Sequence, residues 1–378
     1  MISFNKPCNT NNEEQYVLKT LKSSKMSGDG HYSKKCETWF KNYLKTKKTL
    51  LTPSCTAALE MSAMLINIKE GDEVIMSSYT FVSTANAFVL RGAKIVFIDI
   101  NPKTMNIDED LIEKAITSKT KAIVLVHYAG VSCDIDKVVE ITKRRKIYLI
   151  EDAAQAMEGY YKNKALGTFG DIGTFSFHET KNYTSGGEGG LLIINNNKLV
   201  KRAEIIREKG TNRTQFFRGE IDKYSWVDLG SSYLPSELQS AYLWGQLENV
   251  ELIRKNRLDS WNLYYELLKP LSNKNLFELP FIPDYSNHNA HIFYLKLKNI
   301  KQRTKFINYL RENDVYSVFH YIPLHSSIAG LKFGKFHGND NFTTIESEKL
   351  VRLPMYYGLK EEEIRYIVEV IKKFFTQL

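Results

Sequence analysis

The sequence predicts an α/β fold with a mixed, mostly parallel sheet flanked by helices, followed by a smaller C-terminal α+β domain. Three observations predict it. Short apolar runs recur between residues 73 and 151, segments of helical periodicity separate them, and the pattern changes near residue 246. Strands that alternate with helices are typical of parallel sheets covered by helices. We therefore assign residues 1–245 to the large domain and residues 246–378 to the small one.

The strands of the large domain are predicted from four runs rich in β-branched residues, at 73–76, 94–98, 122–126 and 147–150. Apolar runs of this length are typical of strands buried on both faces. The segment between the second and third runs, 108–116, has helical periodicity and acidic residues in its first turn, which favours a helix there.

In an open parallel sheet, ligands bind beyond the carboxyl ends of the strands. The residues that follow the predicted strands are therefore the first candidates for a site: 77–81, Asp99, His127 and Asp152.

The C-terminal part begins with a long charged amphipathic segment, 247–268, which predicts a helix. Residues 292–297 alternate between apolar and polar as a strand does. Apolar residues at helical spacing in the tail, 364–375, predict a last helix that packs back onto this domain.

The composition excludes several classes of protein. A chain of 378 residues with 43% hydrophobic and 25% charged side chains is an ordinary globular protein, large enough for two domains. No run approaches the roughly 20 apolar residues of a membrane-spanning helix, and the N-terminal segment lacks a secretion signal, so we expect a cytoplasmic protein without a membrane partner. The formal net charge is +9, but its Lys and Arg are spread along the chain, so we expect no nucleic-acid partner.

The four cysteines, Cys8, Cys36, Cys55 and Cys133, have no metal-ligand spacing. We therefore expect free thiols and no metal site.

The most informative stretch runs from residue 147 to residue 190. The last apolar run ends in Glu151-Asp152-Ala153-Ala154-Gln155. Taken alone, Asp152 is equally well interpreted as a helix N-cap. Residues 173–178 then alternate as a strand that places Thr174, Ser176 and His178 on one face, and Lys181 follows it. The chain thus supplies a carboxylate at one strand end and a lysine after the next strand.

A carboxylate and a lysine arranged around a flat aromatic ring are what pyridoxal phosphate requires. The lysine forms a Schiff base with the aldehyde, and the acid keeps the pyridine nitrogen protonated. A phosphate cup is predicted at residues 52–60, where hydroxyl side chains and free backbone N–H groups gather at the start of an Ala- and Leu-rich helix. Without the other motifs, a simple N-cap by Ser54 or Thr56 would be the better interpretation.

In this order, the motifs resemble the DegT/DnrJ/StrS family of nucleotide-sugar aminotransferases. The matching segments are PSCTAAL at 53–59, YTFVST at 79–84, VHYAG at 126–130, EDAAQ at 151–155, FSFHETKN at 175–182, GEGG at 187–190 and HYIPLH at 320–325. The resemblance covers nearly the whole chain. It implies the fold-type I aminotransferase fold, pyridoxal 5'-phosphate as cofactor with pyridoxamine 5'-phosphate as its intermediate form, and a homodimer that shares its active sites.

Within the family, the loops at 178–183 and 226–237 most resemble the transaminase type of the enterobacterial common antigen pathway. That resemblance implies transfer of an amino group from L-glutamate to C4 of dTDP-4-keto-6-deoxyglucose, which gives dTDP-4-amino-4,6-dideoxygalactose and 2-oxoglutarate.

Carried over residue by residue, the resemblance implies that Lys181 is the Schiff-base lysine and that Asp152 pairs with the pyridine nitrogen. Gln155 would donate to the phenolic oxygen of the ring, and Phe81 would stack on its face. The cofactor phosphate would be held by Thr56, the N–H of Ala57, Ser176, and Ser232 from the neighbouring subunit.

Two positions depart from the family pattern. Many relatives have asparagine where this chain has Ser232. Cys55 replaces the commoner glycine of the phosphate loop, at a cost of about 1 kcal/mol if that position requires a positive φ.

Substrate contacts are predicted from side-chain chemistry. Arg213 and Arg218 are the first candidates for the pyrophosphate, because a guanidinium binds phosphate in a bidentate fashion. His178, His320, Tyr321 and His325 are candidates for the sugar pocket. The alternatives are solvated charges for the arginines and hydrogen-bonded structural roles for the histidines.

Other functions stay open at the level of the sequence. A pyridoxal-phosphate-binding regulator without turnover is one, although Lys181, Asp152 and Gln155 together argue against it. A sugar dehydratase of the family would carry histidine in place of Lys181. Among transaminases, the alternatives make the 4-amino-4,6-dideoxyglucose epimer or a 3-amino sugar.

Overall fold

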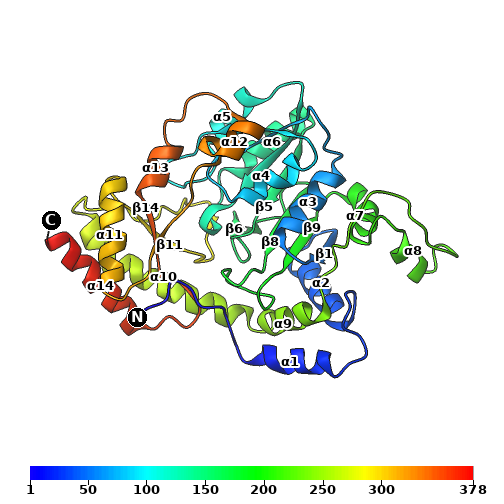
Figure 1. The fold of residues 1–378 in the computed structure, drawn as a ribbon, viewed down its shortest axis with the longest axis horizontal. Coiled ribbons are helices and arrows are strands. Elements are labelled where there is room, and N and C mark those ends of the chain that lie inside the picture. Colours follow the sequence, from blue (N-terminus) through cyan, green and yellow to red (C-terminus); the bar gives the residue numbers. More distant parts are fainter. Residues whose placement is uncertain (378) are drawn as a thin grey trace.

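The large domain is built on an eight-stranded sheet flanked by helices (Figure 1). The computed structural model describes residues 1–377. The strand order is β1-β9-β8-β5-β4-β2-β3-β13, and β9 alone runs in the direction opposite to the other strands. The strands are β1 (Lys48–Thr52), β2 (Glu73–Ser77), β3 (Lys94–Ile98), β4 (Thr120–Val126), β5 (Tyr148–Asp152), β8 (Ile172–Ser176), β9 (Gly190–Ile194) and β13 (Gly334–Phe336).

The predicted α/β architecture is confirmed, and the four predicted runs are the central strands β2, β3, β4 and β5. The predicted helix at 108–116 is α5 (Glu109–Ala115), where the Asp108 side chain caps the N-terminus by accepting from the N–H of Asp110. The strand predicted at 173–178 is β8, which ends at Ser176. Lys181 therefore lies in a loop beyond the strand end.

Both faces of the large sheet are buried, which is why its central strands carry apolar residues on both faces. Val74 and Met76 of β2 join one hydrophobic cluster and Ile75 joins the other. One cluster includes α3 (Cys55–Leu65), α4 (Val82–Val89) and α7 (Val200–Arg207). The other includes α2 (His31–Leu44), α5, α6 (Ile135–Arg145) and α9 (Glu237–Leu247). Each buried Ile or Val side chain contributes roughly 1.5–3 kcal/mol to stability.

The C-terminal part has its own antiparallel sheet of three strands, β11 (Phe293–Lys296), β14 (Leu350–Leu353) and β12 (Val318–Phe319). Its core includes residues of α10 (Val250–Ser272), α11 (Ile300–Glu312) and α14 (Glu361–Thr376). These elements match the helix, strand and tail helix predicted from the sequence. Ile2 joins this core, and Figure 1 shows both ends of the chain on this side of the molecule.

Where the two domains divide stays a prediction. The core near α14 includes Ile2, whereas β13 returns to the edge of the large sheet beside β3. The chain thus passes between the two parts more than once.

The remaining elements are short. A third sheet holds β6 (Tyr160–Tyr161), β7 (Lys164–Ala165) and β10 (Ser286–Asn287). The other helices are α1 (Asn12–Leu21), α8 (Arg213–Phe217), α12 (Ile328–Phe333) and α13 (Thr343–Lys349), and single 3-10 turns occur at Tyr128–Gly130, Asn197–Leu199 and Leu324–Ser326.

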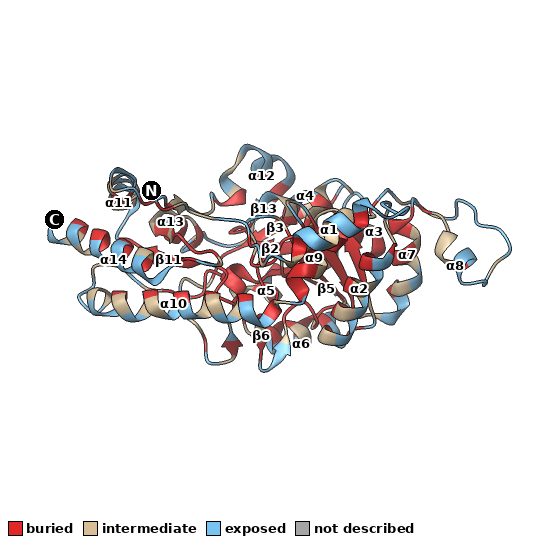
Figure 2. Ribbon diagram, turned by 90° about the horizontal axis from the view of Figure 1, so that it is seen from below, coloured by how far each residue is buried: buried red, intermediate tan, exposed pale blue. Residues whose placement is uncertain are grey.

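The segment 208–235, which we call the arm, extends from the body of the molecule with α8 near its tip (Figure 2). Phe217 and Trp226 of the arm are 68% and 77% exposed. Across residues 1–377, no helix combines the length and the apolar character needed to cross a bilayer.

Candidate active site

A cavity of about 480 Å³ lies at the carboxyl ends of the central strands. The large domain lines it with residues from the ends of β4, β5 and β8, from the N-termini of α3 and α4, and from the loop after β8. His291, His320, Tyr321 and Arg352 line it from the C-terminal part. This is the edge of the sheet at which the sequence predicts ligand binding.

Asp152, the last residue of β5, lies buried at this cavity. Its carboxylate accepts hydrogen bonds from the hydroxyl of Thr84 (2.6 Å) and the N–H of Ala154 (3.2 Å). Burial raises the pKa of Asp152, while those two hydrogen bonds and the charge of Lys181 oppose the rise. A cationic partner would stabilise a carboxylate in this setting, and a protonated pyridine nitrogen is such a partner.

Lys181 lines the same cavity as Asp152. Burial lowers the pKa of Lys181, and the positive charge of Arg352 acts in the same direction, against Cys55 and Asp152. A lysine with a lowered pKa is more often neutral, and a neutral amine can act as a nucleophile and as a base. The two residues singled out for chemistry in the sequence are therefore brought together.

Gln155 has a fixed orientation. Its Oε1 accepts from the N–H of Ala129 (2.8 Å), so the amide nitrogen remains as the donor and lies 3.1 Å from the hydroxyl of Tyr321. A donor at this point suits a phenolic oxygen. Phe81 is 56% exposed although it lines the cavity, which leaves its ring face available to a flat ligand.

The N-terminus of α3 forms the wall at which the sequence predicts a phosphate cup. Ser54 is the N-cap, and its Oγ accepts from the N–H of Ala57 (3.1 Å). Ser54 thus acts as the N-cap that the alternative interpretation describes, and the N–H of Ala57 already has a hydrogen-bond partner within the chain. Thr56 donates to Ser83 (2.8 Å), and Ser176 also lines the cavity.

Cys55 carries no strain from its place in this wall. It is the first residue of α3 and is not among the residues with positive φ, so the cost expected for replacing a glycine does not arise. The close approach is made by Gly190 instead, because a Cβ there would lie 2.4 Å from the carbonyl carbon of Ser54. The strand that packs behind the cup, rather than the cup itself, requires the glycine.

His178, His320 and Tyr321 all line the cavity. His320 Nδ1 lies 3.1 Å from the hydroxyl of Tyr128, and burial lowers the pKa of His320 well below its ordinary value, which favours the neutral ring. His178 Nδ1 lies 2.9 Å from the hydroxyl of Thr180.

His325 does not line the cavity. It bonds to Ser78 (2.6 Å) and lies 3.1 Å from Asp340, which is the structural alternative considered for it.

Arg213, Arg218 and Ser232 lie on the arm and do not line the cavity of their own chain. Arg218 is paired with Glu204 (3.0 Å) and Glu220 (2.7 Å), and the guanidinium of Arg213 lies over the ring of Phe217. Ser232 forms a backbone bridge with Glu208. Their proposed contacts therefore require a second subunit.

Three cavity residues lie outside every sequence motif named above: Phe4, His291 and Arg352. His291 Nδ1 lies 2.9 Å from the side-chain oxygen of Asn182, which anchors the loop after β8 to the C-terminal part. For Arg352 a signal exists, since it is a charged residue inside an apolar strand. The sequence alone does not tell which part of the molecule lies against the face of that strand on which Arg352 is placed.

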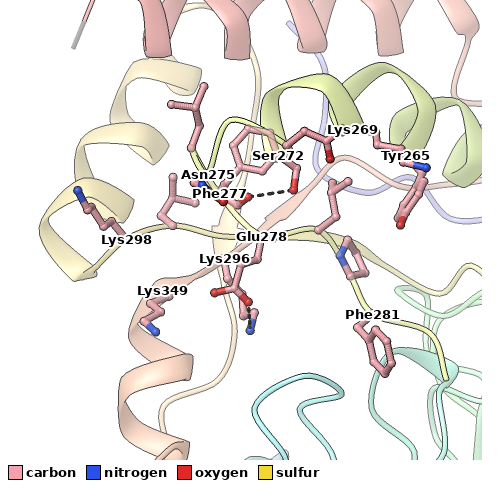
Figure 3. A pocket seen from close by; sticks show the side chains of 15 residues that line it. Tyr265, Lys269, Ser272, Asn275, Phe277, Glu278, Phe281, Lys296, Lys298 and Lys349 are labelled. Carbon is pink, nitrogen blue, oxygen red and sulfur yellow. Dashed lines mark hydrogen bonds and ion pairs between the residues drawn. The ribbon is translucent and has the colours of Figure 1, made fainter.

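A second cavity, of about 550 Å³, lies in the C-terminal part beside α10 and β11 and contains none of the predicted site residues. Lysines line it, and Figure 3 shows Lys296 beside Glu278, to which it is paired at 2.7 Å. Lys296 is also paired with Glu346 (2.8 Å), and Lys349 is paired with Glu346. Much of the charge here is balanced locally.

The residues of the first cavity fit pyridoxal phosphate. A buried carboxylate, a lysine of lowered pKa, a fixed amide donor, an exposed phenylalanine ring and a helix N-terminus are the partners that its nitrogen, aldehyde, phenolic oxygen, ring face and phosphate need.

Comparison with known proteins agrees with this geometry. The model of the DegT/DnrJ/EryC1/StrS aminotransferase family matches residues 7–372. The uncharacterized protein MJ1066 of Methanocaldococcus jannaschii is 35% identical over 98% of this chain and 97% of its own length. GDP-perosamine synthase of Vibrio cholerae is 29% identical over 100% of both chains.

A solved structure extends the likeness to the fold. The putative sugar aminotransferase Spr1654 of Streptococcus pneumoniae, in its PLP-form, superimposes with a TM-score of 0.88 at 26% identity over 100% of this chain and 99% of that one. The fold-type I aminotransferase fold expected for this chain is thereby confirmed.

Proposed function

This chain belongs to the DegT/DnrJ/EryC1/StrS aminotransferase family, and on that premise we propose that it is a pyridoxal-phosphate-dependent transaminase acting on a nucleotide sugar. The observation that carries the proposal is that Lys181 and Asp152 line one cavity, beside the N-terminus of α3. A binding protein without turnover would not need a lysine whose pKa is lowered.

When bound, pyridoxal phosphate supplies an aldehyde that accepts the amino group and a ring that withdraws electrons from the reacting carbon. The residues of the chain hold and move protons around it. Asp152 keeps the proton on the pyridine nitrogen, and Gln155 donates to the phenolic oxygen. Lys181 takes the proton from Cα of the amino donor in the first half of the reaction and returns a proton to the sugar carbon in the second. Thr56 and Ser176 hold the phosphate.

The substrate we propose is dTDP-4-keto-6-deoxyglucose, with L-glutamate as donor and the C4 amine of galacto configuration as product. The loops at 178–183 and 226–237 support this choice. A second candidate is a GDP-linked sugar, because the family relative from Vibrio cholerae is a GDP-perosamine synthase. Lys181 performs the same proton transfers for either nucleotide.

We also propose a homodimer in which the arm of one subunit completes the site of the other. Large apolar side chains are exposed on the arm and on α12, where Ile328 is 92% and Leu331 71% exposed. A second copy would cover them and bring Ser232, Arg213 and Arg218 to a cavity.

The test is to incubate the protein with cofactor, L-glutamate and dTDP-4-keto-6-deoxyglucose, with the GDP-linked 4-keto-6-deoxy sugar in parallel, and to determine the position and configuration of the amine by NMR. An amine at C3, or a product of gluco configuration, would contradict the proposed substrate and product. Either result would leave the transaminase assignment intact. Absence of any reaction with glutamate would favour the non-catalytic regulator.

A further inference from the structure

The residue that follows Lys181 is held by the C-terminal part of the chain. Asn182 is 5% exposed, and its side-chain amide nitrogen donates to the carbonyl oxygen of Asn289 (2.9 Å). Its side-chain oxygen lies 2.9 Å from Nδ1 of His291, which is 4% exposed and lines the same cavity as Lys181. Both ends of this amide are therefore bound by one short segment, 289–291, in the connection between β10 and β11.

This arrangement fixes the proton of the His291 ring. The amide oxygen of Asn182 has no proton to give, so Nδ1 of His291 carries the proton and donates it. Burial lowers the pKa of His291 well below its ordinary value, and the positive charge of Lys181 acts in the same direction. Both effects favour the neutral ring, which with its proton on Nδ1 is able to make this hydrogen bond.

The same segment is tied to the loop after β5. The side-chain nitrogen of Asn289 donates to the carbonyl oxygens of Gln155 (2.8 Å) and Met157 (2.7 Å). The side-chain oxygen of Asn289 accepts from the N–H of His291 (3.1 Å), and a Cβ at Gly130 would collide with that oxygen. The segment thus packs directly on the turn after β4 and joins the two loops that carry the lysine and the fixed amide of the site.

The loop after β8 depends on such contacts because its backbone is irregular. Lys181 belongs to neither a helix nor a strand, and its N–H donates to the carbonyl oxygen of His178 (2.9 Å). Further along the loop, the hydroxyl of Tyr183 donates to the carbonyl oxygen of Val250 (3.2 Å). Asn182 is the side-chain anchor next to the lysine, and a displacement of about 1 Å in a reacting group can cost about 100-fold in rate.

We propose that His291 is a positioning residue for Lys181: its hydrogen bond to Asn182 fixes the loop so that the lysine amine meets the reacting carbon. The inference rests on the proposed transaminase function, in which Lys181 moves the protons. It adds a residue of the C-terminal part that acts through Asn182 and does not itself exchange protons with the substrate.

Two variants separate the two nitrogens of the His291 ring. His291→Asn keeps a donor near the place of Nδ1, whereas His291→Gln keeps a polar group near the place of Nε2 and removes that donor. With glutamate and the keto sugar, we expect kcat to fall about 10- to 100-fold in His291→Gln and less than about 3-fold in His291→Asn, with KM changed less than about 3-fold in both. His337→Gln, which alters a histidine outside the cavity, is the control.

Two forms of the cofactor report the position of Lys181 without turnover. Pyridoxal phosphate reacts with the lysine amine, whereas pyridoxine 5'-phosphate lacks the aldehyde and uses the ring and phosphate contacts alone. In the cofactor-free protein, we expect His291→Gln to slow the reaction with pyridoxal phosphate at least about tenfold, followed by absorbance, and to change the Kd of pyridoxine 5'-phosphate by less than about 3-fold.

A double-mutant cycle tests whether His291 acts through Asn182. Asn182→Ala should lower kcat to about the level of His291→Gln, and combining the two changes should lower it by less than about 3-fold more, because they remove the same hydrogen bond. Losses that multiply in the double variant would overturn the inference.

Three other results would also overturn it. Equal losses of kcat in His291→Asn and His291→Gln would show that the Nδ1 donor is not what matters. Equal losses for both cofactor forms would show general damage to the site. A raised KM with an unchanged kcat would assign His291 to the substrate.

Failure of the proposed function has a different signature. If the unaltered protein transfers no amino group, the transaminase assignment fails, and the measurements with the two cofactor forms still decide whether His291 positions Lys181. Circular dichroism and thermal unfolding of each variant show whether the fold is retained.

Discussion

The hydroxyl of Thr84 donates a 2.6 Å hydrogen bond to the carboxylate of Asp152. Thr84 lies in the first turn of α4, and Thr80, just before that helix, contributes a hydroxyl 2.8 Å from that of Thr84. The carboxylate of Asp152 at the end of β5 is therefore held in place by two buried threonines from the connection between β2 and β3. Its position is set by residues of the chain itself.

Replacing Thr84 tests this arrangement. Thr84→Val keeps the shape and removes the donor, so the pKa of Asp152 should rise further. Because Asp152 acts as an anion, we expect cofactor affinity to fall by about tenfold and the acidic limb of the pH–rate profile to move to higher pH. Titration of the apoenzyme with pyridoxal phosphate measures the first effect. Thr84→Ser is the matched control, and a valine variant with an unshifted profile would deny Thr84 this role.

Lys181→Ala should abolish turnover and spare binding of the cofactor. The phosphate, ring and pyridine contacts do not involve this lysine, whereas both proton transfers do, so we expect kcat to fall by at least about 10³-fold. Steady-state assays with glutamate and the keto sugar, with Lys198→Ala as an exposed-lysine control, give the comparison. Near-normal rates in the Lys181 variant would exclude it as the acid–base group.

The pKa of Lys181 can be measured in the cofactor-free protein by chemical labelling of its amine. Burial and the charge of Arg352 hold it below the ordinary value of 10.5, so amine-modifying reagents should label Lys181 at lower pH than they label exposed lysines. Mass spectrometry across a pH series measures the midpoint for each site. Arg352→Gln removes one positive charge and should move the midpoint of Lys181 upward. A midpoint equal to that of the surface lysines would contradict the electrostatic argument.

Glu151 should stabilise the fold in a pH-dependent way. Its buried carboxylate bonds to His127 (2.9 Å) and accepts N–H groups of Gly167 (2.8 Å), Phe169 (2.6 Å) and Gly170 (2.7 Å). Burial alone would raise the pKa of Glu151, but these contacts outweigh it and lower the pKa below 4.5.

The sign follows from this shift. With a folded-state pKa below the unfolded value, the stabilisation is complete above pH 4.5 and is lost as the pH falls through the folded-state pKa. Glu151→Gln should therefore lower the free energy of unfolding by about 2–3 kcal/mol at neutral pH, with the difference shrinking in acid. Urea unfolding at several pH values measures it, and a difference independent of pH would refute the assignment.

The sequence predicts the centre of this fold well and its edges poorly. Residues 95–98 are apolar because β3 is buried on both faces, and such runs are visible without a structure. β13, in contrast, is three residues long, Gly334–Phe336, and joins the large sheet only because the C-terminal part folds back onto it. No local pattern encodes that return.

The same distinction applies to the site. Asp152 and Lys181 stand out because Asp152 ends one strand and Lys181 follows the next, and strand ends converge at one edge of a parallel sheet. Arg352 reaches the cavity from another sheet, so its role depends on how the two parts of the chain pack together. Arg213 and Arg218 are predicted from guanidinium chemistry alone, and the sequence does not show that Glu208, Glu204 and Glu220 lie beside them.

The first residues of the chain have a practical importance for handling the protein. The N–H of Ile2 donates to the carbonyl oxygen of Asp314 (2.7 Å), and two residues later Phe4 covers Arg352 inside the cavity. An affinity tag fused ahead of Met1 would disturb a segment that forms part of the binding pocket. Affinity tags should therefore be placed at the C-terminus. Kinetic values measured with an N-terminal fusion need to be compared with those of a sample from which the tag has been cleaved.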